Sequence, residues 1–131
     1  MVRRTSPTFT EVELEFMQVI WEKGQVSTED IQTTLAEQNR HLSDGSIRKI
    51  LSILMRKDHL ARRRVGRSFF YRAKERENHS HRNIVKDLLR RAFRDSPSLM
   101  VAALLGIKDV NREDIEEIKK LIAEHERGEE Q

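Results

Sequence analysis

The sequence predicts a mainly α-helical protein with one small β-hairpin. Only 5 Gly and 2 Pro occur in 131 residues, which disfavours a turn-rich all-β fold. Apolar residues recur at helical spacing along most of the chain. A single pair of strand-like segments surrounds Gly66-Arg67, and a Gly-X pair suits a two-residue hairpin turn.

The first expected helix covers residues 11–23. Thr10 and Glu13 have the spacing of a capping box, and Gly24 ends the apolar repeat. Glu13 and Glu15 are both expected to lie at the exposed surface of this helix, so we do not expect them to work as an acid–base pair.

A second and a third helix follow. Ser27 or Thr28 is expected to cap the second helix, which fades near residues 39–40. Ser43 or Asp44 is expected to begin the third. A one-sided apolar stripe at positions i, i+3, i+4 and i+7 marks the third helix, and consists of Ile47, Ile50, Leu51 and Leu54.

Two strands are expected over residues 60–65 and 68–72, joined by Gly66-Arg67. Phe69 and Tyr71 share one face of the second strand, and we expect both to be core residues. Three helices followed by a hairpin is the order of a winged helix-turn-helix.

The predicted organisation is therefore a winged-helix domain over residues 1–75 and a helical domain over residues 76–131. In the second domain, helices are expected over residues 77–94, after the cap Ser96 and after the cap Asn111. No internal repeat or low-complexity tract is seen.

The helices of the second domain carry more apolar surface than three short helices can bury among themselves. Pairing with a second copy would bury it in an interface of about 2,000 Å² or more. The alternative is that this surface packs on the first domain. The residues expected at the dimer interface are Val85, Leu88, Leu89, Phe93, Leu99, Ala102, Leu105, Ile115, Ile118, Leu121 and Ile122.

Charge is distributed unevenly. Residues 1–47 carry four basic residues against eight acids, and residues 75–131 carry eleven against thirteen. Residues 48–74 carry ten basic residues against Asp58 alone, a net charge of +9. Such a block repels itself unless a polyanion neutralises it, which favours a nucleic-acid partner.

The basic block coincides with the third helix and the hairpin. An α-helix fits the major groove of B-DNA, where Arg or Lys pairs with guanine, while arginines of a wing bind the sugar–phosphate backbone. Duplex DNA is preferred to single strands because the hairpin aromatics are expected in the core. The predicted DNA-binding residues are Ser43, Ser46, Arg48, Lys49, Ser52, Arg62, Arg63, Arg64 and Arg67.

Several other functions are disfavoured. The chain has no Cys, which removes disulfides, thiol catalysis and Cys-ligated metals. His79-Ser80-His81 is interpreted as a solvated helix start, and residues 109–120 lack the Gly and Glu of a calcium loop. We therefore expect no enzyme activity, no cofactor and no metal. No apolar run approaches the roughly 20 residues that span a bilayer, so we expect a cytoplasmic protein without membrane insertion.

One rival interpretation stays open beside DNA binding. A winged helix could serve as a protein–protein interaction module of a larger assembly, in which the basic block meets an acidic protein. Salt-dependent binding to random duplex DNA separates these two hypotheses.

Four segments carry a resemblance to a known family. They are Thr10–Trp21, with Glu13, Met17 and Trp21 in place, Ser46–Leu51, Gly66–Tyr71, and Ser98–Val101 followed by Asp114–Ile118. Together, in this order and over about residues 9–123, they resemble the penicillinase-repressor (BlaI/MecI-type) transcriptional regulators. In that family they form the opening helix, the recognition helix, the wing and the dimerisation region.

The resemblance implies a homodimer that binds a palindromic operator and blocks transcription. It also implies release by a membrane sensor–protease that cuts the short helix of the C-terminal part, at a position matching Ala102-Ala103 here. A first departure from the family lies at this position, because the family's cut sites resemble Asn-Phe and this pair does not. A second departure is Asp58, where the family usually has Gly after the recognition helix. The copper-responsive relatives have a cysteine cluster, which this chain lacks.

Overall fold

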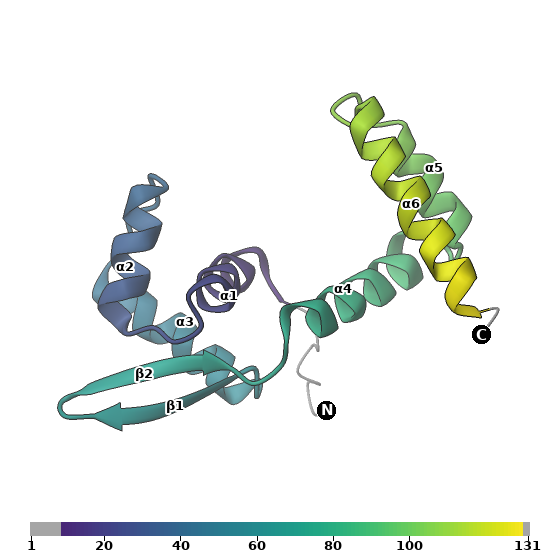
Figure 1. The fold of residues 1–131 in the computed structure, drawn as a ribbon. Helices are drawn as coiled ribbons and strands as arrows, with labels where there is room; N and C mark the ends of the chain where they lie inside the picture. The colour runs from purple at the N-terminus through teal and green to yellow at the C-terminus, as the bar shows by residue number, and fades with distance from the viewer. Residues whose placement is uncertain (1–8, 130–131) are drawn as a thin grey trace. The chain divides into compact units, whose positions relative to one another are not determined.

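The computed structural model describes residues 9–129, and its elements agree closely with those expected from the sequence (Figure 1). In chain order they are α1 (Glu11–Lys23), α2 (Thr28–Glu37), α3 (Asp44–Arg56), β1 (Leu60–Val65), β2 (Ser68–Ala73), α4 (Glu77–Ala92), α5 (Pro97–Leu105) and α6 (Arg112–Glu129). The mainly α-helical fold with one β-hairpin is thus confirmed.

Side-chain caps fix where the first helices begin. Thr10 and Glu13 form the reciprocal capping box at α1, with N–O distances of 3.0 and 3.2 Å. Of the two candidate caps for α2, the structure uses Ser27, which forms a second capping box with Asp30. Ser43 caps α3. Each cap satisfies backbone N–H groups that a helix start leaves unpaired.

The core lies among α1, α2, α3 and the base of the hairpin. Its fully buried side chains come from the inner face of each element, as the helical spacing of apolar residues predicts. The largest are Phe16, Met17, Ile20, Val26, Ile31, Leu35, Ile47, Leu51, Leu54 and Leu60. This core orients α3 and the hairpin.

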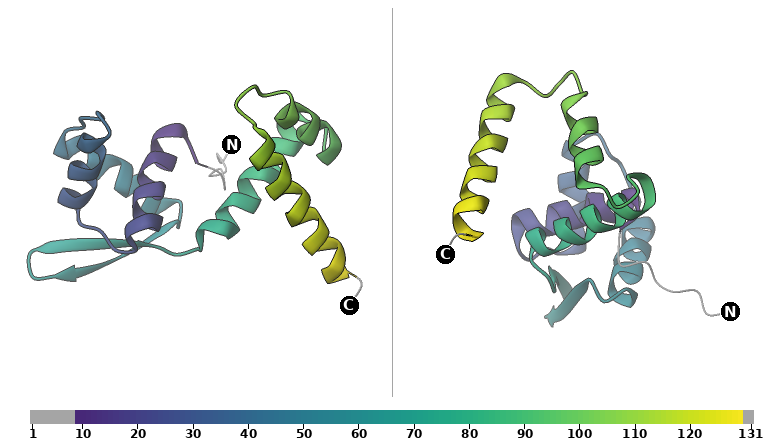
Figure 2. Two further views of the ribbon diagram at one scale, coloured as in Figure 1. Left: turned by 45° about the horizontal axis from the view of Figure 1, so that its top comes forward. Right: turned by 90° about the vertical axis from the view of Figure 1, so that its right-hand side faces the viewer.

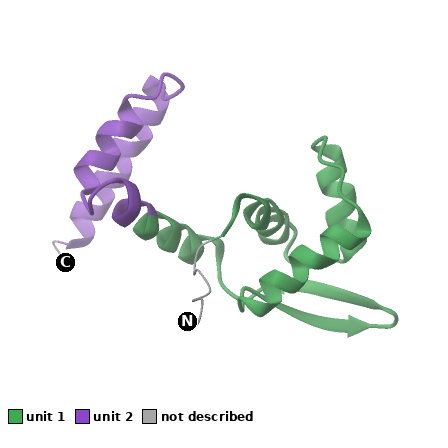
Figure 3. Ribbon diagram, turned by 180° about the vertical axis from the view of Figure 1, so that it is seen from behind, with its two compact units in different colours: residues 1–87 green, residues 88–131 purple. Residues whose placement is uncertain are grey.

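β1 and β2 pair antiparallel, from Leu60 opposite Ala73 to Val65 opposite Ser68. The turn is the predicted two-residue Gly66-Arg67, and Gly66 adopts a φ of +64°, which glycine tolerates without strain. The segment between α1 and α2 adds a short third edge, because Val26 and Tyr71 exchange backbone hydrogen bonds of 3.0 and 2.7 Å. The hairpin is therefore anchored at its base, and its turn projects beyond the three helices (Figures 1 and 3).

The expectation that Glu13 is exposed is wrong. Its carboxylate is buried, with 4% of the side chain accessible, and Oε1 lies 2.7 Å from Nζ of Lys57. Lys57 follows α3 and is itself only 14% exposed. The same carboxylate oxygen accepts the backbone N–H of Thr10, so one acid closes a helix cap and joins α1 to the end of α3.

The chain forms two compact units, residues 1–87 and 88–131, and the division falls inside α4 (Figure 3). The start of α4 belongs to the first unit because it packs on α1. Trp21 donates a hydrogen bond from Nε1 to the backbone oxygen of Glu75, and its ring meets that of His81 edge-on. The assignment of separate functions to residues 1–75 and 76–131 stays a prediction.

The second unit contains the end of α4 together with α5 and α6. Ser96 caps α5, as expected, and Asn111 and Asp114 bond each other reciprocally at the start of α6. The two helices run in roughly opposite directions from a connecting loop (Figure 2). Neither α5 nor α6, as far as the structure describes them, contains a buried residue.

Candidate nucleic-acid interface

Helix α3 has one buried face and one exposed face. Ile47, Leu51 and Leu54 are fully buried against the core. The opposite face presents the predicted DNA-binding side chains of this helix, and all of them are exposed: Ser43, Ser46, Arg48, Lys49 and Ser52. The helix is therefore held by its apolar stripe while its short and basic side chains face solvent.

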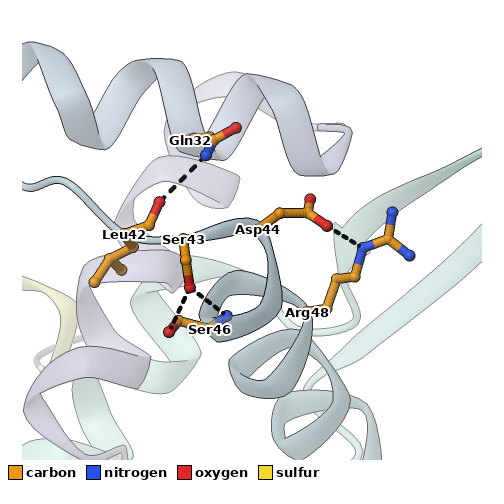
Figure 4. A network of polar contacts seen from close by, with 6 residues as sticks. All are labelled: Gln32, Leu42, Ser43, Asp44, Ser46 and Arg48. Atoms are coloured by element: carbon orange, nitrogen blue, oxygen red, sulfur yellow. Dashed lines mark hydrogen bonds and ion pairs between the residues drawn. The ribbon is translucent and has the colours of Figure 1, made fainter.

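The start of α3 is fixed by a local network (Figure 4). The Ser43 hydroxyl accepts the backbone N–H of Ser46 at 3.1 Å and donates to the Ser46 hydroxyl at 2.9 Å. The Gln32 side chain, from α2, donates to the backbone oxygen of Leu42 at 3.2 Å. Ser43 is thus a capping residue, and the turn between α2 and α3 has a defined conformation.

The first residue of α3, Asp44, forms an ion pair with Arg48 one turn later. Its Oδ2 lies 2.8 Å from Nε of Arg48 (Figure 4). Because the side chains are 58% and 71% exposed, the pair stabilises the fold by only about 0.3–0.5 kcal/mol. Its main effect is on the orientation of the arginine.

The structure at the end of α3 shows how Asp58 is accommodated, at the position where the resemblance leads one to expect glycine. Asp58 has a φ of +68°, in the left-handed region, and its N–H bonds the Met55 carbonyl while that of His59 bonds Leu54. Lys74 hydrogen-bonds the Asp58 carboxylate and, as an adjacent cation, lowers the pKa of that carboxyl. This close contact ties the helix end to the residue that follows β2.

The two faces of the hairpin differ. The register places Arg62 and Arg64 on the same face as Phe69 and Tyr71, while Arg63 lies on the other face with Phe70. The Arg62 guanidinium stacks 4.2 Å from the centre of the Phe69 ring, and Arg64 donates to the Gly66 carbonyl at 3.0 Å.

The expectation that both hairpin aromatics are core residues holds for Tyr71 and fails for Phe69. Tyr71 is 7% exposed, whereas Phe69 is 36% exposed and lies near the turn. The physical reason is that the hairpin extends beyond the helices, so only its base can be covered. Phe69 instead provides an apolar platform for the Arg62 side chain.

A groove of about 600 Å³ lies where α3 meets the hairpin. Four of the predicted DNA-binding residues line it: Arg48, Ser52, Arg62 and Arg67. The other five do not, namely Ser43, Ser46, Lys49, Arg63 and Arg64. The sequence predicted that α3 and the hairpin contribute to one surface, but it could not distinguish the residues that line the groove from those that do not.

The groove also contains residues that the sequence interpretation did not select. Ser27, Thr28 and Glu29, at the start of α2, form part of its wall, and so does Asp44. A capping serine near a basic helix was the available signal for the α2 residues, because a helix start offers backbone N–H groups to phosphates. For Asp44 the signal was its i, i+4 spacing from Arg48.

His59 lies behind this interface, at the junction of α3 and β1. Its ring centre is 4.4 Å from that of Phe9, and its Nε2 is buried without a hydrogen-bond partner in the described structure. Burial lowers the pKa of the imidazole, and the nearby charge of Glu75 opposes this shift in part. Burial thus favours the neutral form of this side chain.

The family model described as "Penicillinase repressor" matches residues 9–124, which covers α1 to most of α6. The chain belongs to the penicillinase repressor family. The four motifs of the sequence predicted this family, and they lie in α1, α3, the β1–β2 hairpin and the α5–α6 region.

Curated relatives agree with this assignment. The penicillinase repressor of Bacillus licheniformis is 26% identical over 119 residues, covering 91% of this chain and 92% of that protein. The penicillinase repressor of Staphylococcus aureus is 23% identical over 110 residues, covering 84% and 86%. An uncharacterized 16.5 kDa protein of Latilactobacillus sakei is 26% identical over 113 residues, covering 86% and 77%.

Solved structures are similar too. The solution structure of the DNA-binding domain of the repressor BlaI is 28% identical, with a TM-score of 0.49, and covers 57% of this chain and 90% of that one. A complex structure of hsRosR-S1 is 14% identical, with a TM-score of 0.54, and covers 92% and 94%. The likeness to hsRosR-S1 shows the fold alone, and the assignment to the family depends on neither structure.

As a member of this family, the protein is a DNA-binding transcriptional repressor. Within residues 9–129 no three or more His, Cys, Asp and Glu side chains gather in a way that could hold a metal ion. The described helices of the repressor also include none with the length and apolar character needed to cross a membrane.

Proposed function

We propose that this repressor binds a specific, dyad-symmetric operator as a homodimer. The observation that carries the proposal is the groove in which Arg48 and Ser52 of α3 face Arg62 and Arg67 of the hairpin. A basic helix beside a basic wing provides base contacts from one element and phosphate contacts from the other.

In this proposal α3 enters the major groove of the operator. Ser46, Arg48, Lys49 and Ser52 are exposed on its outer face and supply guanidinium, ammonium and hydroxyl groups for base edges. The arginines of the hairpin, among them Arg63, contact the backbone and carry no sequence preference.

The second unit supports the homodimer. Apolar side chains of α4, α5 and α6 remain accessible in the single chain, for example Leu88 at 45%, Leu105 at 52% and Leu121 at 64%. A second copy of the same surface is the simplest partner that covers them. Two-fold symmetry would then place two α3 helices about one turn of DNA apart, or a multiple of it.

We further propose that derepression acts on this second unit, through cleavage by a membrane sensor–protease or through another signal. Ala102 and Ala103 lie in α5 and are exposed, and Ala102 belongs to the surface proposed for dimerisation. A cut between them would divide α5 and weaken the dimer. Mass spectrometry of the repressor from induced cells tests this: a fragment ending at Ala102 supports cleavage, whereas an intact chain under derepression indicates another signal.

The operator proposal is tested by selecting bound sequences from a random duplex pool, followed by footprinting. We expect one enriched motif with dyad symmetry and a protected region on both half-sites. Six to eight phosphate contacts predict a slope of about −5 to −7 for log K against log salt. Equal binding to all sequences, or a stable monomer in sedimentation at micromolar concentration, would contradict the proposal.

Two arginine variants separate the roles of helix and wing. Arg48→Ala should lower the preference for operator over random DNA, by about 1–3 kcal/mol if a bidentate base contact is lost. Arg63→Ala should weaken binding to operator and random DNA alike. Equal losses on both DNAs for Arg48→Ala, and likewise for Lys49→Ala, would show that α3 does not read bases.

A further inference from the structure

Two acidic side chains, Glu29 of α2 and Asp44 of α3, line the basic groove, and Asp44 is the one that forms an ion pair with an arginine of α3. Helix α3 contains a single acid, Asp44, and it lines the groove together with Arg48, Arg62 and Arg67. A carboxylate at this position repels the phosphates that the groove is suited to bind. Its contribution to stability is small because the ion pair with Arg48 is largely exposed. As an acid in the first turn of α3, Asp44 also stabilises the helix, by about 0.3–1 kcal/mol. That contribution does not require contact with an arginine of the groove, which leaves room for a second role.

The geometry of the ion pair between Asp44 and Arg48 indicates what this second role is. Asp44 forms its ion pair with Nε of Arg48, at 2.8 Å, and the two terminal nitrogens of the guanidinium point away from the carboxylate (Figure 4). In the described part of the chain, the structure records no other hydrogen bond or ion pair for these two nitrogens. A free pair of parallel N–H groups is what guanine O6 and N7 accept.

We propose that Asp44 is a specificity-determining positioning residue of the repressor. Its carboxylate holds Arg48 by Nε, so that the terminal nitrogens of Arg48 read one guanine in each half-site. The same negative charge penalises binding modes in which Arg48 turns toward a phosphate. Asp44 thus lowers affinity for random DNA and raises discrimination, an inference that rests on the proposed operator binding.

If Asp44 contacted a base itself, its removal would change base preference in a different way. A carboxylate can itself accept a hydrogen bond from the amino group of cytosine. In that case removal of Asp44 would change the preference at a base pair of its own, independent of Arg48. A positioning role instead makes the effect of Asp44 depend on the presence of Arg48.

The test is sequence selection and titration with the full-length repressor carrying Asp44→Asn, Arg48→Ala or both substitutions. We expect Asp44→Asn to bind random duplex about three- to tenfold more tightly at low salt, since a dimer loses two repelling charges. At the base pair that Arg48→Ala no longer distinguishes, Asp44→Asn should lose about tenfold in discrimination. The double variant should discriminate no worse than Arg48→Ala alone, and Asp44→Glu should restore part of the preference.

Glu116→Gln is the matched control. Glu116 forms an exposed ion pair with Lys119 in α6, at 3.6 Å, so this variant removes an equal charge and breaks a comparable pair outside the first unit. We expect less than a twofold change in affinity for random DNA and the same selected motif as the unsubstituted repressor. Equal thermal midpoints for all variants exclude unfolding as the cause.

Each outcome decides between the proposals. If the unsubstituted repressor selects no sequence, operator binding fails and the role of Asp44 fails with it. If it selects a motif that Asp44→Asn leaves unchanged, or if Asp44→Asn alters a base pair unrelated to Arg48, operator binding stands and the positioning role is wrong. Tighter random binding by Glu116→Gln equal to that of Asp44→Asn would also overturn it, because net charge alone would then explain the effect.

Discussion

The two units of the chain use apolar residues in opposite ways. In the first unit, leucines such as Leu51 are fully buried among α1, α2, α3 and the hairpin. In the second unit, α5 is the most apolar helix of the described chain and yet buries none of its residues, and Leu121 of α6 is 64% exposed. Similar side chains therefore stabilise the fold in one unit and stay available for a partner in the other.

Ion pairs show the same contrast. The buried pair of Glu13 and Lys57 joins two helices at 2.7 Å, whereas the pair of Glu116 and Lys119 is exposed and lies within one helix at 3.6 Å. A buried pair holds the fold strongly once its partners are in place, while an exposed pair contributes little. The first unit thus contains a buried ion pair that joins two of its helices, whereas the exposed pair in α6 adds little to the second unit.

The largest expected effect comes from a matched pair of leucine substitutions. Leu51→Ala should lower the free energy of unfolding of the first unit by about 2–5 kcal/mol, because it leaves a cavity in the core. Leu121→Ala should change it by less than about 0.5 kcal/mol. Denaturation followed by the fluorescence of Trp21, the single tryptophan, reports on the first unit. Similar losses for both variants would remove the contrast between the units.

A second matched pair of substitutions compares the buried ion pair with the exposed one. Glu13→Gln keeps a side chain able to cap α1 but leaves the Lys57 ammonium without its partner, so we expect a loss of about 3 kcal/mol. Glu116→Gln should lose less than about 0.5 kcal/mol. Chemical denaturation at neutral pH measures both. A loss below 1 kcal/mol for Glu13→Gln would mean that the cap alone accounts for the role of Glu13.

The sequence predicted the helices and strands well because the residues that begin and end each element lie close to one another in the chain. The caps at Thr10, Ser96 and Asn111, and the turn at Gly66, depend on residues a few positions apart. The apolar stripe of α3 likewise predicted its buried face. All nine predicted DNA-binding residues are exposed on α3, at its cap or on the hairpin.

What the sequence did not predict depends on contacts between distant residues. Glu13 is buried because Lys57, 44 positions later, neutralises it. Phe69 is exposed because it lies near the turn of the hairpin, which extends beyond the helices that cover its base. The groove formed by α3 and the hairpin required their relative placement, which no local pattern contains.

Backbone conformation at a helix end gives a smaller expected effect. Asn39 follows α2 with a φ of +64°, in the left-handed region that disfavours most side chains. Asn39→Ala should destabilise the first unit by about 1 kcal/mol, and Asn39→Gly should be neutral or slightly stabilising. Arg94, with a φ of +51° in the second unit, offers the matching test, since Arg94→Gly should leave the Trp21 transition unchanged. Denaturation curves of the three variants check this.

The smallest effect is the pH dependence that His59 adds to the first unit. Because burial lowers its pKa below the ordinary 6.5, the unfolded chain binds a proton more readily than the folded one. Stability from this group is therefore complete above pH 6.5 and falls as the pH drops toward the lowered pKa. His59→Gln should flatten the pH dependence of the Trp21 transition below about pH 6.5. His125→Gln, in a side chain that is 77% exposed in the second unit, should leave the dependence unchanged. An identical slope for His59→Gln and the unsubstituted protein would show that the buried imidazole is not the group that titrates.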